Sequence, residues 1–320
     1  MEHKKVLLGK LKPALGLLIF SVLISILRPN FMTVSNLFNV LRQTSINAVI
    51  AAGMTFVILT GGIDLSVGSI LAFSSAVAVW MLQSGQNIFL SLFACLFIGA
   101  LAGLFNSIVI TKGKVQPFIA TLATMTLLRG ATFVFMGGRP ITLKIVKEAS
   151  NFQSLTFFRW IGGGKLPLLQ IPTPIFIMLL VFLISWHILN NTPIGRYIYA
   201  IGGNEEATKL SGLNVDKIKS FAYIINALLA SLAGLIVASR LLSAQPTAGD
   251  SYELDAIAAV VLGGTSLAGG QGSVLATILG ALIIGVLNNA LNLLDVSSYY
   301  QMIVKAIVIL IAVLLDRKQK

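Results

Sequence analysis

Ten stretches of mainly apolar residues, separated by shorter polar interruptions, follow one another along this chain. Most are long enough for a helix to cross the ~30 Å hydrocarbon core of a bilayer. Lipid offers the backbone no hydrogen-bond partner outside its own segment, so these stretches are expected to be helices. The pattern predicts an all-α polytopic membrane protein with about ten transmembrane helices, near residues 13–28, 43–61, 66–82, 88–110, 117–136, 171–190, 220–242, 254–264, 273–294 and 299–315.

The composition favours the same class over a soluble all-α domain. Of 320 residues, 56% are hydrophobic and only 11% are charged, whereas charged residues make up about a quarter of a typical globular chain. The net charge of +12 is explained by topology, so no nucleic-acid partner is needed to account for it.

The basic residues predict the orientation. With both termini in the cytoplasm, the outer side holds Arg28 and the basic residues of segment 137–170. The inner side then holds a larger set, as the positive-inside rule requires: Lys4, Lys5, Lys10, Lys12, Lys112, Lys114, Arg196, Lys209, Lys217, Lys219, Arg317, Lys318 and Lys320.

The charged interruption 191–219 falls on that inner side and contains the signals of a short helix. Gly202-Gly203 ends the preceding element, Asn204 is a good N-cap, acidic residues follow in the first turn, and a glycine can terminate the helix. A surface helix of this kind could dock in a groove of a cytoplasmic partner, or the loop could be an ordinary solvated connector. The docking hypothesis assigns the contact to Gly203, Asn204, Glu205, Glu206, Ala207, Thr208, Lys209, Leu210 and Gly212.

A glycine-containing break occurs twice. Residues 53–68 read GMTFVILTGGIDLSVG and residues 255–270 read DAIAAVVLGGTSLAGG. Paired glycine-interrupted segments in two halves of a membrane protein point to a transport pathway. The elements could be broken spans or re-entrant segments, and the two halves could be parallel or inverted repeats.

Polar residues in or beside the apolar stretches are the candidates for the pathway, since a buried charge in a membrane usually faces protein or water. Asp64 is the preferred one because it shares a break with glycine. Each candidate could instead make an interhelical hydrogen bond or lie at a helix end, and that alternative is favoured for Arg129 and Lys305. The predicted translocation path consists of Gln43, Asn47, Gly61, Gly62, Asp64, Ser66, Gly263, Gly264, Ser266 and Asn288.

Sequence motifs for chemistry are missing. The chain has no GxxxxGK[ST], HExxH or GxSxG motif, only two histidines, and a single cysteine, Cys95. We therefore predict no catalytic residue, no metal site and no cofactor in this chain. Energy for transport would come from an ion gradient or from a separate protein.

Several blocks of sequence resemble the ribose/galactose permease family, the membrane subunits of monosaccharide ABC importers. They are NLFNVLRQTSINAVIAAGMTFVILTGGIDLSVGS, QPFIATLATMTLLRG, GRYIYAIGGNEEATKLSGLNVDKIK, AQPTAGDSYELDAIAAVVLGGTSLAGGQGS and VSSYYQMIVKAIVILIAVLLD. The resemblance runs in order from about residue 29 to 315. It does not extend to the termini or to segment 137–170.

The resemblance implies a non-catalytic permease in the bacterial inner membrane that carries ribose or a related monosaccharide. It implies a homodimer embedded in lipid, a cytoplasmic ATPase that binds ATP and Mg²⁺, and a periplasmic sugar-binding protein. Residues 1–320 would form one permease domain like that of the vitamin B12 importers, with a coupling loop at 191–219 and a periplasmic loop at 137–170. The alternatives are a gradient-driven secondary sugar transporter, and a passive channel or purely structural membrane subunit.

Overall fold

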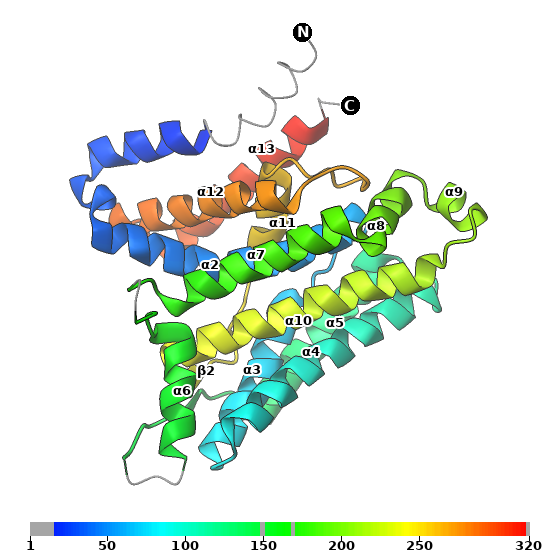
Figure 1. Ribbon diagram of the computed structural model, residues 1–320. Helices are drawn as coiled ribbons and strands as arrows, with labels where there is room; N and C mark the ends of the chain where they lie inside the picture. The colour runs from blue at the N-terminus through cyan, green and yellow to red at the C-terminus, as the bar shows by residue number, and fades with distance from the viewer. Residues whose placement is uncertain (1–15, 148–150, 168–169, 318–320) are drawn as a thin grey trace.

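The computed structural model describes residues 16–147, 151–167 and 170–317, which form a bundle of long helices (Figure 1). The first predicted span begins outside the described residues, as do Lys4, Lys5, Lys10, Lys12, Lys318 and Lys320. An apolar helix, Gly16–Leu27, comes first. The further elements are η1 (Pro29–Met32), α2 (Val34–Leu59), α3 (Val67–Gln83), α4 (Ile88–Thr111), α5 (Pro117–Met136), β1 (Ile141–Thr142), α6 (Phe152–Gly163), α7 (Thr173–Asn191), α8 (Pro193–Gly203), α9 (Glu205–Leu210), α10 (Val215–Leu241), β2 (Ser243–Ala244), α11 (Tyr252–Leu262), α12 (Val274–Leu293) and α13 (Ser298–Arg317).

Each of the ten predicted stretches overlaps a helix. Among the described residues, six helices are long and apolar enough to cross a membrane, namely α2, α4, α5, α7, α10 and α12. The fold is therefore that of an all-α membrane protein. How many of the other helices cross the bilayer stays a prediction.

Two helices begin earlier than the hydrophobic pattern predicted. Helix α2 starts at Val34, where the Thr33 side chain accepts a hydrogen bond from the backbone N–H of Asn36. Helix α10 starts at Val215, with Asn214 as its N-cap. The start of α2 was misplaced because its first turns carry polar side chains, one of which, Asn36, forms hydrogen bonds with Asn289 of α12.

The core is built around α2, α3 and α10. Helix α10 packs against α2, α3 and α4, and residues 48–59 of α2 are fully buried. A Cβ on Gly103 of α4 would lie 2.6 Å from the backbone oxygen of Tyr223 in α10. Glycine at this position therefore lets the two backbones come into close contact.

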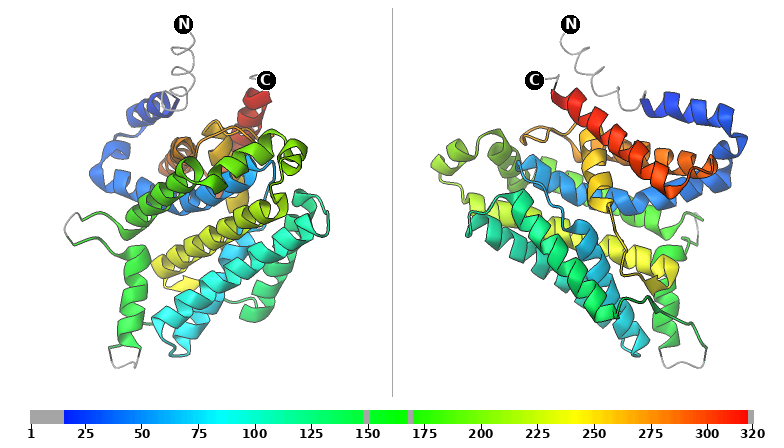
Figure 2. Two further views of the ribbon diagram at one scale, coloured as in Figure 1. Left: turned by 45° about the vertical axis from the view of Figure 1, so that its right-hand side comes forward. Right: turned by 180° about the vertical axis from the view of Figure 1, so that it is seen from behind.

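Segment 137–170 has secondary structure that was not predicted. Strand β1 pairs antiparallel with β2, and α6 packs against α7 and α10. Leu155, Phe158 and Ile161, spaced three apart along α6, are buried, a helical signal already present in the sequence. Helix α6 lies at one end of the molecule and α9 at the opposite end (Figures 1 and 2).

Candidate functional site: a polar cavity, two glycine breaks and segment 191–219

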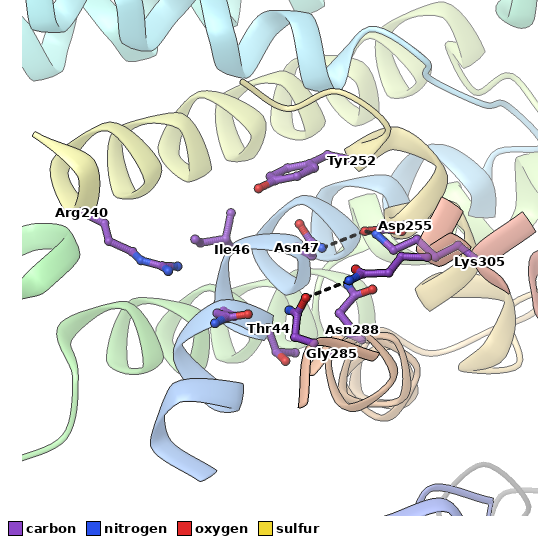
Figure 3. Close-up of a pocket in the computed structure, with 13 residues that line it drawn as sticks. Thr44, Ile46, Asn47, Arg240, Tyr252, Asp255, Gly285, Asn288 and Lys305 are labelled. Atoms are coloured by element: carbon purple, nitrogen blue, oxygen red, sulfur yellow. Dashed lines mark hydrogen bonds and ion pairs between the residues drawn. The ribbon is translucent and has the colours of Figure 1, made fainter. Parts of the chain in front are cut away.

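A polar cavity of about 340 Å³ lies where α2, α11, α12 and α13 meet the end of α10 (Figure 3). Its volume is near the lower end of the ~300–1,000 Å³ found for small-molecule sites. It includes Gln43, Asn47 and Asn288 from the predicted path. All its lining residues are Gln43, Thr44, Ile46, Asn47, Arg240, Tyr252, Asp255, Ala281, Gly285, Asn288, Asn292, Gln301 and Lys305.

An ion pair lies at the cavity wall. The Lys305 ammonium of α13 is 2.9 Å from Oδ2 of Asp255 in α11, whose side chain is 4% exposed. The amide of Asn47 in α2 donates to the same oxygen at 3.2 Å. Lys305 thus has the interhelical hydrogen bond that was expected of it, and this bond lies in the cavity, which the sequence did not reveal.

Amide side chains extend along the helices that line the cavity. Gln43 and Asn47 are four residues apart on α2, and Asn288 and Asn292 have the same spacing on α12. Residues at this spacing share one helix face. Gln301 of α13 donates to the Asn292 side chain at 2.9 Å. Tyr252, Arg240 and Gln301 were not predicted, because nothing local in the sequence connects them with the others.

The first break lies apart from this cavity and is held by buried hydrogen bonds. Asp64 is fully buried, and its carboxylate accepts bonds from the Ser66 backbone N–H at 2.9 Å, the Ser66 hydroxyl and the Asn226 amide at 2.9 Å. Asn106 of α4 donates to the Ser66 hydroxyl at 2.8 Å, and Thr124 of α5 donates to Asn106 at 2.6 Å. This network ties the break to α4, α5 and α10.

The two breaks touch each other. Gly61-Gly62 follows the end of α2, and Gly263-Gly264 follows the end of α11. The backbone N–H of Gly270, beyond the second break, donates to the carbonyl of Leu59 at 3.0 Å. Ser266 is 6% exposed, and its backbone N–H donates to Gln271 at 2.9 Å, within the same loop.

The helix predicted in segment 191–219 is present with the predicted caps. In α9, the Asn204 side chain accepts from the Ala207 N–H at 2.9 Å, and Gly212 follows the helix with φ +88°. Leu210 is 89% exposed. Glu205 pairs with Lys219 of α10 at 2.6 Å. The helix therefore presents an apolar side chain outward and is anchored at its start. Docking of a partner on this helix stays a prediction.

Helix α8 connects this segment with both breaks. The Cα of Gly202 lies so close to the carbonyl of Leu59 and the N–H of Gly270 that a side chain could not fit. The Tyr199 hydroxyl donates to the carbonyl of Gly272 at 3.1 Å. Burial raises the pKa of this hydroxyl above its usual range, so it stays protonated, and a donor, at neutral pH. A second cavity, of about 360 Å³, lies between Asn204, Glu205 and the Gly61-Gly62 break.

Arg129 binds protein, as the favoured alternative predicted. It donates to the carbonyls of Pro246 and Ala248, both at 2.8 Å, and pairs with Asp250 at 2.6 Å. In the part of the chain that the structure describes, no three His, Cys, Asp or Glu side chains form a group that could hold a metal ion.

Comparison with known proteins identifies the class. Residues 36–313 match the family described as branched-chain amino acid transport system / permease component, and the chain belongs to this family. Together with its apolar helices, this makes it a multi-pass inner-membrane transport permease. No solved structure matches the chain.

Three relatives illustrate the similarity. The ribose import permease protein of Haemophilus influenzae is 60% identical over 94% of this chain and 91% of the relative. The ribose import permease protein of Bacillus subtilis is 55% identical over 99% and 97%. The xylose transport system permease protein of Escherichia coli is 35% identical over 91% and 86%.

Proposed function

We propose that this chain is the membrane subunit of a ribose importer and is energised by a separate ATPase. The supporting observation is the 60% identity to a ribose import permease along almost the full length. The xylose permease is much less similar, at 35%, which favours ribose within this group. The chain itself carries no phosphate-binding motif, so ATP and Mg²⁺ would bind to the partner.

The polar cavity is the part of the path that the geometry supports best. Gln43, Asn47 and Asn288 line it, whereas Asp64 and Ser66 bond to each other and to neighbouring helices. In this proposal the sugar passes the amide groups of the cavity. The remaining predicted residues, Gly61, Gly62, Asp64, Ser66, Gly263, Gly264 and Ser266, form the breaks around which helices move.

The driving force would enter at α9. Closure of the ATPase would push on residues 203–212, and the exposed Leu210 with Glu206 offers a contact for it. Helix α8 would transmit the movement, because Gly202 and Tyr199 touch the loops of both breaks. This chain of contacts favours a driven transporter over a passive channel.

The complete assembly would contain two copies of this chain, the ATPase below and a periplasmic sugar-binding protein above. Helices α6 and α9 lie at opposite ends of the molecule (Figure 1). This arrangement supports the assignment of segment 137–170 to the periplasm and of segment 191–219 to the cytoplasm. Both termini would then be cytoplasmic. We also propose that about ten helical segments cross the membrane, in an arrangement like that of the vitamin B12 importers.

Reversing the charges of α9 tests the coupling role. The double variant Glu205→Lys/Glu206→Lys is expected to lose association with the ATPase and the ATP hydrolysis that is coupled to ribose uptake. Glu205 also pairs with Lys219. The variant Lys219→Ala removes this ion pair but leaves both glutamates in place, so it shows how much of the effect comes from the lost ion pair alone. A matched control, Lys144→Glu/Lys147→Glu, reverses two charges at the other end of the molecule.

Two results would contradict the proposal. Unchanged association and coupling in the double variant would remove the docking role. Ribose uptake by this chain alone in proteoliposomes, driven by a pH or sodium gradient, would instead establish the secondary transporter.

A further inference from the structure

The polar cavity contains side-chain atoms without a partner. Thr44 is 2% exposed, and within the described part of the chain neither its Oγ1 nor Oδ1 of Asn288 has a hydrogen-bond partner. Buried polar atoms are normally paired with protein or water, because leaving them unpaired costs free energy. Both residues line the same cavity, so a molecule with hydroxyl groups could supply the missing bonds.

The charges in the cavity favour an uncharged ligand. Asp255 and Lys305 neutralise each other at 2.9 Å, and Arg240 is an exposed residue at the edge. A ligand carboxylate would compete with Asp255 for Lys305 and leave Asp255 buried and unpaired, which is costly. Hydroxyl groups can donate to the carboxylate and accept from the ammonium while the pair stays formed.

The amides define the direction in which such a ligand could move. Asn39, Gln43 and Asn47 repeat every four residues along α2 and so share one face of the helix. Asn39 lines a neighbouring groove of about 820 Å³, together with Asn36, Arg42 and Gln170, and Gln43 and Asn47 line the cavity. Amide groups both donate and accept hydrogen bonds. A polyhydroxy compound that moves along this face can therefore replace a hydrogen bond to one amide side chain with a hydrogen bond to the next.

From these observations we propose that the Asp255–Lys305 pair and the amides of Asn47 and Asn288 form a transient subsite for the hydroxyl groups of an uncharged sugar. The Asn39–Gln43–Asn47 face of α2 leads into it from the outer groove. The inference rests on the proposed function and assigns the sugar contacts that this function leaves open. It places Asp255 and Lys305, which were outside the predicted path, at its centre.

Substitution of the pair gives the first test, in the complete importer with its ATPase and binding protein. Asp255→Asn and Lys305→Met are each expected to lower uptake of radiolabelled ribose about tenfold or more, as loss of a hydrogen bond to a charged group does. Assembly with the ATPase should be retained. The control is Leu275→Ala, at a half-exposed apolar position of α12, which should transport normally.

A cysteine reporter tests contact with the sugar directly. The single native Cys95 is fully buried, so background labelling should be low. In membranes that contain the complete importer, Asn288→Cys should react with a hydrophilic methanethiosulfonate reagent, and ribose during turnover should slow the reaction. Leu275→Cys should show no effect of ribose.

The outcomes separate the inference from the function on which it rests. Loss of uptake with assembly intact, together with protection of Asn288→Cys by ribose, supports the subsite. Retained uptake in both pair variants, or loss of uptake together with loss of assembly, overturns it, and so does absence of protection. If the unmodified importer takes up no ribose, the proposed function itself fails.

Discussion

Among the described residues, the buried carboxylates Asp64 and Asp255 have different surroundings. In the sequence Asp64 directly follows a glycine break, whereas Asp255 lies in the first turn of α11, well before the second break. Asp64 is fully buried and accepts hydrogen bonds from Ser66 and Asn226, and further bonds extend this network to α4 and α5. Asp255 instead pairs with Lys305 at the wall of a polar cavity. The contacts of Asp64 favour a role in holding the first break, and those of Asp255 favour contact with a transported molecule.

Replacing Asp64 should therefore affect stability first. Asp64→Ala leaves the donors of Ser66 and Asn226 without an acceptor, and we expect it to lower the free energy of unfolding by ~1–3 kcal/mol. Thermal unfolding in detergent measures this, with Glu206→Ala on the exposed surface as the control. Normal stability combined with loss of ribose uptake would instead place Asp64 in the path.

At the scale of elements, α8 is the connection between α9 and the interior of the bundle. It begins at Pro193, with Thr192 as its N-cap, and ends at Gly203, directly before α9. Its Gly202 lies against the carbonyl of Leu59 and the N–H of Gly270, the two groups that join the breaks. A displacement of α9 would reach both breaks through this one contact.

The substitution Gly202→Ala tests this connection. The added methyl group would overlap backbone atoms, which cannot rotate away as a side chain can, and overpacking of this kind costs ~1–3 kcal/mol. We expect the two breaks to separate and ribose uptake to fall, as measured by transport assays. Gly130→Ala, with no atom within 4 Å of the added group, is the matched control. Equal transport by both variants would contradict the connection.

At the scale of the whole molecule, α6 and α9 lie at opposite ends of the helix bundle (Figures 1 and 2). Six helices of sufficient length and apolarity lie among the described residues. In the back view of Figure 2, α13 crosses the outer side of α11 and α12, so Lys305 reaches the cavity from the edge of the bundle. Opposite ends of such a bundle are expected to face opposite sides of the membrane.

Thiol labelling of whole cells tests this orientation. A membrane-impermeant maleimide should label Lys144→Cys in cells with a permeable outer membrane, because residue 144 lies in the segment predicted to be periplasmic. Leu210→Cys should react only after the inner membrane is opened. Buried Cys95 makes the unmodified chain a suitable blank. Labelling of Leu210→Cys from outside would reverse the assigned topology.

Much of the architecture follows from local sequence because its causes are local. Apolar length predicts helices, and ten predicted stretches coincide with helices. Asn204 and Gly212 predict the ends of α9, since a cap acts through its own backbone neighbours. The start of α2 was predicted too late, because an amide such as Asn36 resembles a polar loop until its partner on α12, Asn289, is known.

The site depended on tertiary structure. Gln43, Asn47 and Asn288 were predicted from their polarity, but their meeting with Asp255 and Lys305 brings α2 against α11, α12 and α13, which lie almost two hundred residues further along the chain. The contact between the two breaks, and that of α8 with both, likewise arises from packing. The sequence by itself determined the ten apolar helices, the caps of α9 and the membrane class, because hydrophobicity and capping act within a segment. Only the tertiary structure decided which buried polar groups face a cavity and which hold a turn. The role of each group depends on the residues that lie opposite it on the neighbouring helix.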